Sequence, residues 1–228
     1  MKILFATTNP NKVREVRHAL RAAPPYEIVT LADVAPVPDE PEEIGTTYWE
    51  NARIKALAYA QATGLTTIAE DSGFEVDALG GEPGVQSARF LDPTTSYPDR
   101  FAEIYRRLAA DKPKGLSPQQ PSGGDQPLGL SSSARFVTAL AVARGDELLF
   151  ETESAIEGIV ARAPAGQHGF GYDPIFYYPP FGGTVAQLSD DHKTAVSHRA
   201  RAFRDLHRWL RTRRTEAATN VVRHSTNL

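Results

Sequence analysis

The chain of 228 residues contains no cysteine and no long apolar run. Without cysteine it has no disulfide framework, no thiolate metal site and no cysteine nucleophile. The longest mainly apolar stretch, 136–143, has the length of a strand, whereas a membrane-spanning helix needs roughly 18 apolar residues. The apolar stretch at 3–6 is too short for a secretory signal. We therefore expect a soluble, cytoplasmic protein without contact to a membrane.

An excess of positive charge is also missing, since the formal net charge is −3. Dedicated nucleic-acid-binding proteins are usually basic, and disordered chains have fewer apolar residues than the 41% present here. Nucleic acid is therefore an unexpected partner. The charge is uneven. All charged side chains in residues 33–50 are acidic, whereas residues 193–228 have a local net charge of +7. Both segments are interpreted mainly as solvated surface. The alternative is that the acidic segment supplies a metal ligand and the basic helix faces an anion.

Hydrophobic periodicity predicts an α/β fold, with a central mixed sheet flanked by helices. The expected strands are 2–6, 26–31, 66–69, 135–143 and 147–159, and the expected helices are 10–23, 47–63, 96–110 and 190–211. These elements form one domain over residues 1–211. Residues 112–133 are rich in Pro, Gly, Ser and Gln, which predicts a flexible insertion, and residues 212–228 are expected to form a tail.

The first strand leads directly into a helix through a polar segment, residues 7–12. Asn9 is the expected N-cap and Pro10 the first helical residue. A helix N-terminus favours phosphate, and a bound anion would also offset the unfavourable position of Lys12 in the first turn. The alternative is an ordinary capped strand–helix turn.

Two further candidates lie on the second helix and the strand after it. Asn51 and Lys55 are spaced i, i+4 and share one face of a largely apolar helix. Lys55 needs a partner or a pocket there, unless it reaches solvent. Glu70 and Asp71 stand where the strand is expected to end, before Ser72. Carboxylates in such a place can hold Mg²⁺ or orient a water molecule, and the alternative is a surface turn.

The last two candidates are a glycine-rich loop and the start of the final helix. Residues 166–174 combine three glycines with Phe170, Tyr172 and Asp173. This composition suits a loop that approaches a ligand, or a tight structural turn. Arg199 falls within the apolar stripe of the final helix, where an arginine is unusual unless it pairs or lines a cavity.

Together these segments resemble the inosine triphosphate pyrophosphatase family over residues 2–211. The segments that carry the resemblance are 7–12, 50–56, 70–90, 170–176 and 193–199, in this order. The resemblance implies a two-lobed fold around a long mixed sheet, with the active-site cleft between the lobes. It also implies a homodimer that hydrolyses ITP, dITP and XTP to the monophosphate and pyrophosphate with Mg²⁺.

The resemblance also implies roles for individual residues. Asp71 would be the general base and a metal ligand, and Glu43 the second metal ligand. The substrate-binding residues would be Thr7, Thr8, Asn9, Pro10, Asn11, Lys12, Lys55, Ser72, Phe170, Gly171, Tyr172, Asp173, Lys193, His198 and Arg199, supported by Asn51 and Glu70. Many members of the family have aspartate where Glu70 stands. Donors from His198 and Arg199 would accept the C6 carbonyl of hypoxanthine or xanthine and mismatch the amino group of adenine.

The Arg-rich C-terminal helix could also bind RNA or DNA, although the overall acidity of the chain and the apolar stripe on that helix argue against it. Besides this, two other functions remain open from the sequence. One is a Maf-type nucleotide pyrophosphatase, which would act on pyrimidines, although the segments at 170–173 and 198–199 favour purines. The other is a nucleotide-binding protein without turnover, against which the Glu43 and Asp71 pair argues.

Overall fold

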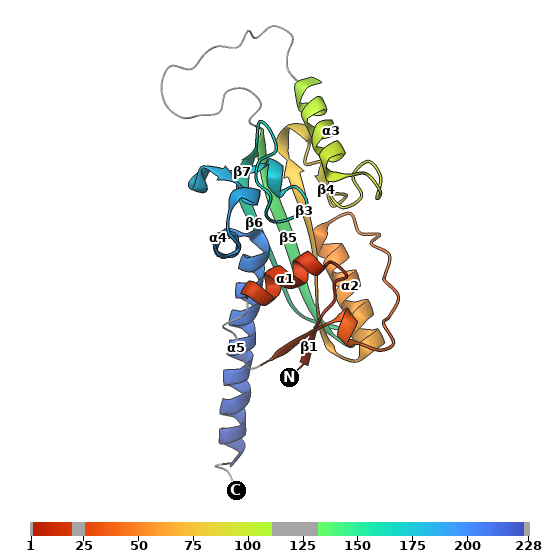
Figure 1. Ribbon diagram of the computed structural model, residues 1–228. Helices are drawn as coiled ribbons and strands as arrows, with labels where there is room; N and C mark the ends of the chain where they lie inside the picture. The colour runs from red at the N-terminus through yellow and green to blue at the C-terminus, as the bar shows by residue number, and fades with distance from the viewer. Residues whose placement is uncertain (1, 20–25, 111–131, 226–228) are drawn as a thin grey trace.

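The computed structural model describes residues 2–19, 26–110 and 132–225, with side chains described up to Arg213. A mixed eight-stranded sheet forms its centre, in the order β2-β1-β3-β5-β6-β7-β8, with β4 paired to β3 (Figure 1). The strands are β1 (Lys2–Phe5), β2 (Glu27–Thr30), β3 (Thr66–Val76), β4 (Pro83–Gly84), β5 (Ser133–Arg144), β6 (Glu147–Val160), β7 (Phe176–Tyr178) and β8 (Gly183–Thr184). The helices are α1 (Pro10–Ala19), α2 (Tyr48–Thr63), α3 (Tyr97–Ala110), α4 (Asp190–Val196) and α5 (His198–Ser225). The predicted α/β architecture is confirmed.

Helix α2 covers one face of the sheet and is set by local signals at both ends. Thr47 and Glu50 form a capping box at its start, and Gly64 ends it in the left-handed conformation, at φ 68°. Its small residues Ala52 and Ala56 pack on the small side chains of β3 and β5. This close contact places the polar face of α2 directly beside β3.

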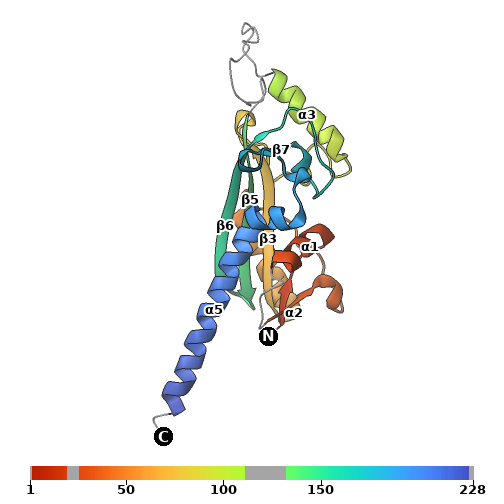
Figure 2. The ribbon, with the colours of Figure 1, turned by 60° about the vertical axis from the view of Figure 1, so that its left-hand side comes forward.

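Helices α1 and α5 cover the opposite face of the sheet. Phe203 of α5 meets Phe5 of β1 edge to face, with ring centroids 5.3 Å apart, and Val16 of α1 joins the same core. Figure 2 shows α5 running along the sheet and then continuing beyond it. Among the described residues no helix is both long enough and apolar enough to cross a membrane.

Strand β3 connects two lobes because its edge has different partners at its two ends. Its first residues, 66–68, pair with β1, and residues 74–75 pair with β4. Between these pairings, residues 69–73 face no strand on that edge within the described chain. One lobe holds β1, β2, α1 and α2, and the other holds β4, α3, β7 and β8. The uncovered stretch of β3 therefore opens into a cleft between the lobes.

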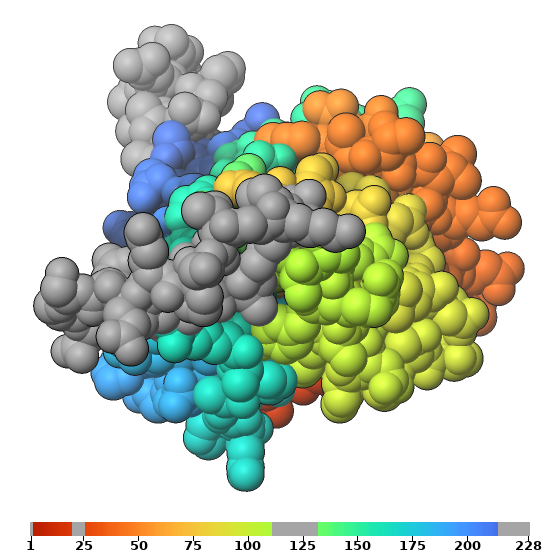
Figure 3. Space-filling model, turned by 90° about the horizontal axis from the view of Figure 1, so that it is seen from above, coloured from red at the N-terminus to blue at the C-terminus, as the bar shows by residue number. Residues whose placement is uncertain are grey.

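The second lobe has a core of its own, formed by α3, β7 and the far halves of β3, β5 and β6. Seen from above, α3 and the segment that leads into it lie beside the residues that follow β6 (Figure 3). Phe101 and Ile104 of α3 pack in this core with Ile175 and Phe176. The loop at 170–173 is thereby fixed against the lobe that carries α3.

Three boundaries differ from the sequence prediction. Strand β3 does not end before Glu70 but continues to Val76, paired with β5 along its length. The expected final helix is two helices, which meet at the extended backbone of Ser197 (ψ 147°), and the second helix continues to Ser225. Residues 212–225 of the expected tail belong to α5, whereas 111–131 of the expected insertion lie outside the described residues. So do residues 20–25, into which the first helix was expected to continue.

Candidate functional site

A cleft with a cavity volume of about 150 Å³ lies along the uncovered edge of β3. Most of the predicted site residues meet in it, although they come from six separate stretches of the chain. Those that line it are Asn9, Lys12, Glu43, Lys55, Asp71, Ser72, Phe170, Gly171, Tyr172, Asp173, Lys193, His198 and Arg199. The cleft has a cationic end formed by α1 and α2 and an aromatic end formed by the second lobe.

The strand–helix segment at 7–12 is divided between two places. Asn9 and Lys12 line the cleft, whereas Thr7, Thr8 and Pro10 line a neighbouring groove between α1 and the turn after β2. Asn11 lines neither, and its backbone N–H donates to Asn9 Oδ1 at 2.9 Å. This bond confirms Asn9 as the N-cap of α1.

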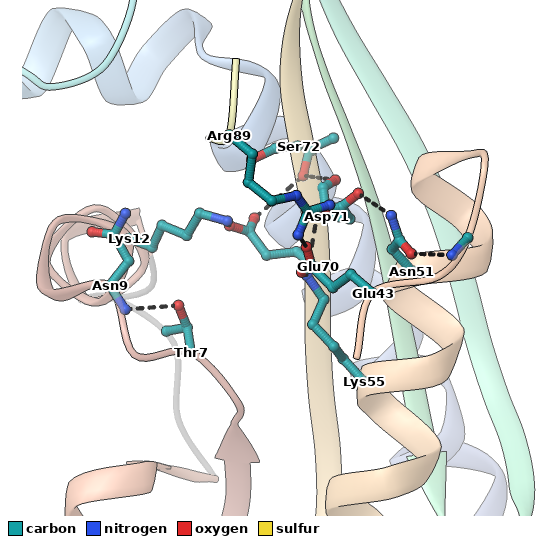
Figure 4. A network of polar contacts seen from close by, with 12 residues as sticks. Thr7, Asn9, Lys12, Glu43, Asn51, Lys55, Glu70, Asp71, Ser72 and Arg89 are labelled. Atoms are coloured by element: carbon teal, nitrogen blue, oxygen red, sulfur yellow. Dashed lines mark hydrogen bonds and ion pairs between the residues drawn. The ribbon is translucent and has the colours of Figure 1, made fainter. Parts of the chain in front are cut away.

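Asp71 is held by two side chains of α2 (Figure 4). Asn51 Nδ2 donates to Asp71 Oδ2 at 3.2 Å, and Lys55 Nζ lies 3.3 Å from Asp71 Oδ1. The orientation of the Asn51 amide is set by the backbone N–H of Gly45, which donates to its oxygen at 2.8 Å. A Cβ at Gly45 would come within 2.6 Å of that oxygen, so only glycine allows this approach. Burial raises the pKa of Asp71 above its ordinary value, although Lys55 opposes the rise.

Glu43 and Asp71 share one cation, the ammonium group of Lys55. Lys55 Nζ lies 2.5 Å from Glu43 Oε1, and burial would raise the pKa of Glu43, but Lys55 and Arg89 hold it below its ordinary value. No group of three or more acidic, histidine or cysteine side chains suited to a metal occurs in the described parts of the chain. Mg²⁺ commonly takes one or two protein carboxylates together with phosphate oxygens and water. The pair therefore fits a magnesium ion that binds together with a phosphate ligand.

Glu70 points to the opposite face of β3, because neighbouring strand residues alternate. Its carboxylate accepts from Arg199 Nε at 2.9 Å and lies 3.1 Å from Lys12 Nζ. Burial alone would raise the pKa of Glu70, but Arg199 and Lys12 lower it to about 2. Burial lowers the pKa of Lys12, against the attraction of Glu70. Glu70 therefore supports the site by compensating two cations of the cleft.

Arg199 connects α5 to strand β3 and to helix α1. Besides Glu70, its guanidinium donates to Ser72 Oγ at 3.1 Å and to the carboxylate of Glu15 on α1. Glu15 also lies 2.5 Å from Lys193 Nζ, and Arg199 and Lys193 lower its pKa to about 2 against the effect of burial. Glu15 was missed from the sequence. The available signal was its position three residues after Lys12, on the same face of α1.

The aromatic end of the cleft is built around Phe170. Lys193 Nζ and the Arg199 guanidinium carbon lie 4.9 Å and 5.6 Å from its ring centroid. Asp173 Oδ2 accepts from the Phe170 backbone N–H at 2.8 Å and from Lys193 Nζ at 2.6 Å. The Tyr172 ring is stacked instead on Phe74 in the core. Of the two aromatic residues predicted in this loop, Phe170 therefore offers the ring to a ligand.

His198 lies buried beside this end of the cleft, stacked on Phe136 with ring centroids 5.1 Å apart. Burial and the nearby charge of Arg199 lower the pKa of His198 to about 3. The imidazole is therefore neutral at physiological pH. Its Nδ1 has no hydrogen-bond partner among the residues that the structure describes. A buried, unpartnered ring nitrogen that lines a cleft is suited to a polar edge of a ligand.

The low pKa of His198 predicts a pH-dependent stability. Its folded-state pKa of about 3 lies below the unfolded value of 6.5, so the unfolded state binds more protons between these values. The contribution is fully present above pH 6.5 and is lost as the pH falls, by up to about 1.4 kcal/mol per pH unit. Urea unfolding between pH 7 and 5 should show a steeper loss of stability in the wild type than in His198→Gln, by up to this amount, because the raised pKa values of Asp71 and Asp173 act in the opposite direction in both proteins.

His192→Gln is the control for this measurement, because His192 is exposed and its variant should keep the wild-type slope. The carboxylates with lowered pKa, Glu15 and Glu70, titrate below about pH 4.5 and do not contribute between pH 7 and 5. Equal slopes for the wild type and His198→Gln would contradict a neutral, buried His198.

The fold and the cleft together define the class: a two-lobed α/β protein with a carboxylate pair, several cations and an aromatic pocket at the uncovered edge of its central strand. Residues 3–209 match the sequence profile of the Ham1 family. The chain belongs to this family.

Relatives with names of their own support the same assignment. The chain is 42% identical to a dITP/XTP pyrophosphatase of Thermus thermophilus over 206 residues, which cover 90% of each chain. It is 37% identical to the dITP/XTP pyrophosphatase of Bacillus subtilis, over 91% of this chain and 96% of that one. Among solved structures, a HAM1 protein from Coxiella burnetii superposes with a TM-score of 0.77 and 32% identity, covering 93% of this chain and 99% of that one. The implied family and fold are confirmed.

Proposed function

We propose that the protein hydrolyses the non-standard purine nucleoside triphosphates ITP, dITP and XTP to the monophosphate and pyrophosphate. The observation that carries the proposal is the position of Asp71, between the cations of α1 and α2 and the aromatic pocket around Phe170. A nucleotide matches these two ends of the cleft, because its phosphates are anionic and its base is aromatic. The proposal agrees with the activity named for relatives of this chain.

In this proposal Asp71 acts on a water molecule at the α-phosphorus. Its carboxylate accepts a proton from that water, while Asn51 holds the carboxylate in a fixed orientation. Lys12 and Lys55 lie on the phosphate side and offset the charge of the substrate and of the departing pyrophosphate. A magnesium ion on Glu43 and Asp71 would add positive charge at the phosphate oxygens. The phosphate contacts proposed for Thr7, Thr8, Pro10 and Asn11 would require the phosphate chain to extend beyond the cleft, since these residues do not line it.

Recognition of the base is proposed for the aromatic end. Of the five N–H donors of Arg199, three serve Glu70, Glu15 and Ser72 among the described residues, and one remains on each of its two terminal nitrogens. These donors and the unused nitrogen of His198 would meet the C6 carbonyl of hypoxanthine or xanthine. Adenine has an amino group at that position, so buried donors would be left unpaired and binding would weaken.

The test is a hydrolysis panel of eight nucleoside triphosphates with pyrophosphate as the readout. We expect pyrophosphate from ITP, dITP and XTP and much less from ATP. Preferential release from pyrimidine nucleotides would favour the Maf-type alternative instead. Tight binding of ITP without release of pyrophosphate would favour the other alternative, a nucleotide-binding protein without turnover.

Removal of the metal should stop the reaction. With EDTA in excess we expect no release of pyrophosphate from ITP, and added Mg²⁺ should restore it. Glu43→Gln should raise the Mg²⁺ concentration for half-maximal rate about tenfold or more, since one of two carboxylate ligands is lost. Glu42→Gln is the matched control, because this neighbouring carboxylate is exposed and outside the cleft. An unchanged requirement for Mg²⁺ in Glu43→Gln would remove Glu43 from the metal site.

The family resemblance also implies a homodimer, and the proposed substrate implies a role in the cytoplasmic nucleotide pool. We propose both for this chain. Light scattering should then give twice the mass of the single chain, and a monomer at micromolar concentration would contradict the first proposal.

A further inference from the structure

Arg89 reaches across the cleft from the second lobe to the first. It lies in the segment between β4 and α3, and its Nη1 donates to Glu43 Oε2 at 2.8 Å. Figure 4 shows its side chain extending toward the carboxylates of Glu43 and Asp71. Glu43 therefore holds two cations, with Lys55 on one oxygen and Arg89 on the other. The Arg89 side chain is 37% exposed, so it stands at the mouth of the cleft rather than in its wall.

The backbone that carries Arg89 is fixed from several sides. The carbonyl of Ser87 accepts from Tyr172 Oη at 3.0 Å and from Arg100 Nη1 at 3.1 Å, and Ser87 Oγ accepts from the backbone N–H of Phe74 at 2.8 Å. Arg100 is buried and also donates to the carbonyl of Asp92 at 3.1 Å. The segment is thus tied to β3 and α3 on both sides of Arg89. The backbone of Arg89 is therefore held in a defined place, and only its side chain is free to turn.

The pairing of Arg89 depends on a carboxylate that the proposed function assigns to the metal. Glu43 is the acidic partner of Arg89 among the described residues. The other side-chain hydrogen bond of Arg89 runs from its Nε to the neutral amide oxygen of Gln86, at 3.3 Å. When a divalent cation binds Glu43, it competes with Arg89 for the same negative charge. An arginine released at this point faces the phosphate side of the cleft, and the planar guanidinium group binds phosphate oxygens in pairs. Because the side chain is partly exposed, the change of partner requires little desolvation.

We infer that Arg89 is a binding residue for the phosphate chain, which exchanges Glu43 for a phosphate oxygen when the nucleotide binds with its cation. The inference rests on the proposed function and deepens it, since it assigns the second lobe a contact with the phosphates. The cleft then holds the phosphate chain from both lobes: Lys12 and Lys55 on one side and Arg89 on the other.

The test measures binding of inorganic pyrophosphate with Mg²⁺ by calorimetry, for the wild type, Arg89→Gln and Arg89→Lys. Arg89→Gln should weaken pyrophosphate binding about 10–100-fold, the range for loss of a charged hydrogen bond. Arg89→Lys should recover part of the affinity, because the charge remains and the paired geometry does not. In steady-state kinetics with ITP, Arg89→Gln should raise KM more than it lowers kcat.

Arg53→Gln is the matched control, since Arg53 is also a partly exposed arginine in an ion pair, with Glu151, outside the cleft. Its affinity for pyrophosphate should stay within twofold of the wild type. Binding of Mg²⁺ alone is measured on the same proteins and should not weaken in Arg89→Gln. Pyrophosphate affinity of Arg89→Gln within twofold of the wild type would overturn the inference. So would an equal loss of affinity for Mg²⁺ alone, because Arg89 would then only orient Glu43.

The outcome is separable from the proposed function. If the wild type binds pyrophosphate through Arg89 but releases none from ITP, the proposed hydrolysis fails and the assignment of Arg89 stands. If the wild type hydrolyses ITP and Arg89→Gln binds pyrophosphate as the wild type does, the assignment of Arg89 fails alone.

Discussion

Asp71→Asn should lower kcat for ITP by about 10²–10⁴-fold, the usual contribution of a positioned base. Asparagine keeps the size of the side chain but accepts a proton from water far less readily. It also replaces one carboxylate oxygen by an NH₂ donor, which must face either Asn51 or Lys55, both of which are donors now. Turnover is measured as pyrophosphate release at saturating ITP and Mg²⁺.

Asp77→Asn is the control for this variant. Asp77 follows β3 directly and pairs with Arg135 at 2.5 Å, outside the cleft. It should turn over ITP as the wild type does. A kcat for Asp71→Asn close to that of the wild type would remove Asp71 from the role of base.

Arg199→Met should show two large effects, one on stability and one on selectivity. The Arg199 side chain is almost completely buried and compensates Glu70 and Glu15, so its loss leaves one buried and one partly buried carboxylate short of a partner. Removal of one partner from such a pair usually costs about 3–5 kcal/mol of unfolding free energy. The ratio of kcat/KM for ITP over ATP should fall at least tenfold, because the donors for the C6 carbonyl are lost. Urea unfolding and the two nucleotide assays measure these effects separately.

Two further variants keep this prediction informative. Arg199→Met combined with Glu70→Gln should recover part of the lost stability, since one uncompensated charge is removed. Arg201→Met changes an exposed arginine two residues further along α5 and should alter the free energy of unfolding by no more than about 0.5 kcal/mol. Unchanged selectivity in a folded Arg199→Met protein would place recognition of the purine elsewhere.

The ends of several helices and most of the residues that line the cleft were predictable from the sequence. The capping box at Thr47, the stop at Gly64 and the N-cap at Asn9 follow from short-range rules, and the structure confirms all three. The convergence of residues 12, 55, 71 and 199 on one cleft was implied by the family resemblance, and the geometry agrees with it.

The failures concern interactions between segments far apart in the chain. Glu70 and Asp71 were interpreted as the end of a strand because the apolar stretch stops before them and Gly73 follows. Glu70 pairs with Lys12 and Arg199, and Asp71 pairs with Lys55, so β3 can continue through both carboxylates. Glu15 looks like ordinary helix surface until Lys193 and Arg199 are placed against it. The separation of Thr7 and Thr8 from the cleft depends on the path of the chain between β1 and α1, which local composition does not reveal.

The alternation of Glu70 and Asp71 along β3 restricts how this gene can evolve. An insertion or deletion of a single codon just before these residues would turn each carboxylate to the opposite face, where Glu70 would meet α2 and Asp71 would meet α5. Stability and turnover would be lost in one event. Length variation among descendants is therefore expected to accumulate in segments such as 111–131, which connect α3 to β5 in the chain and leave the alternation of β3 unchanged.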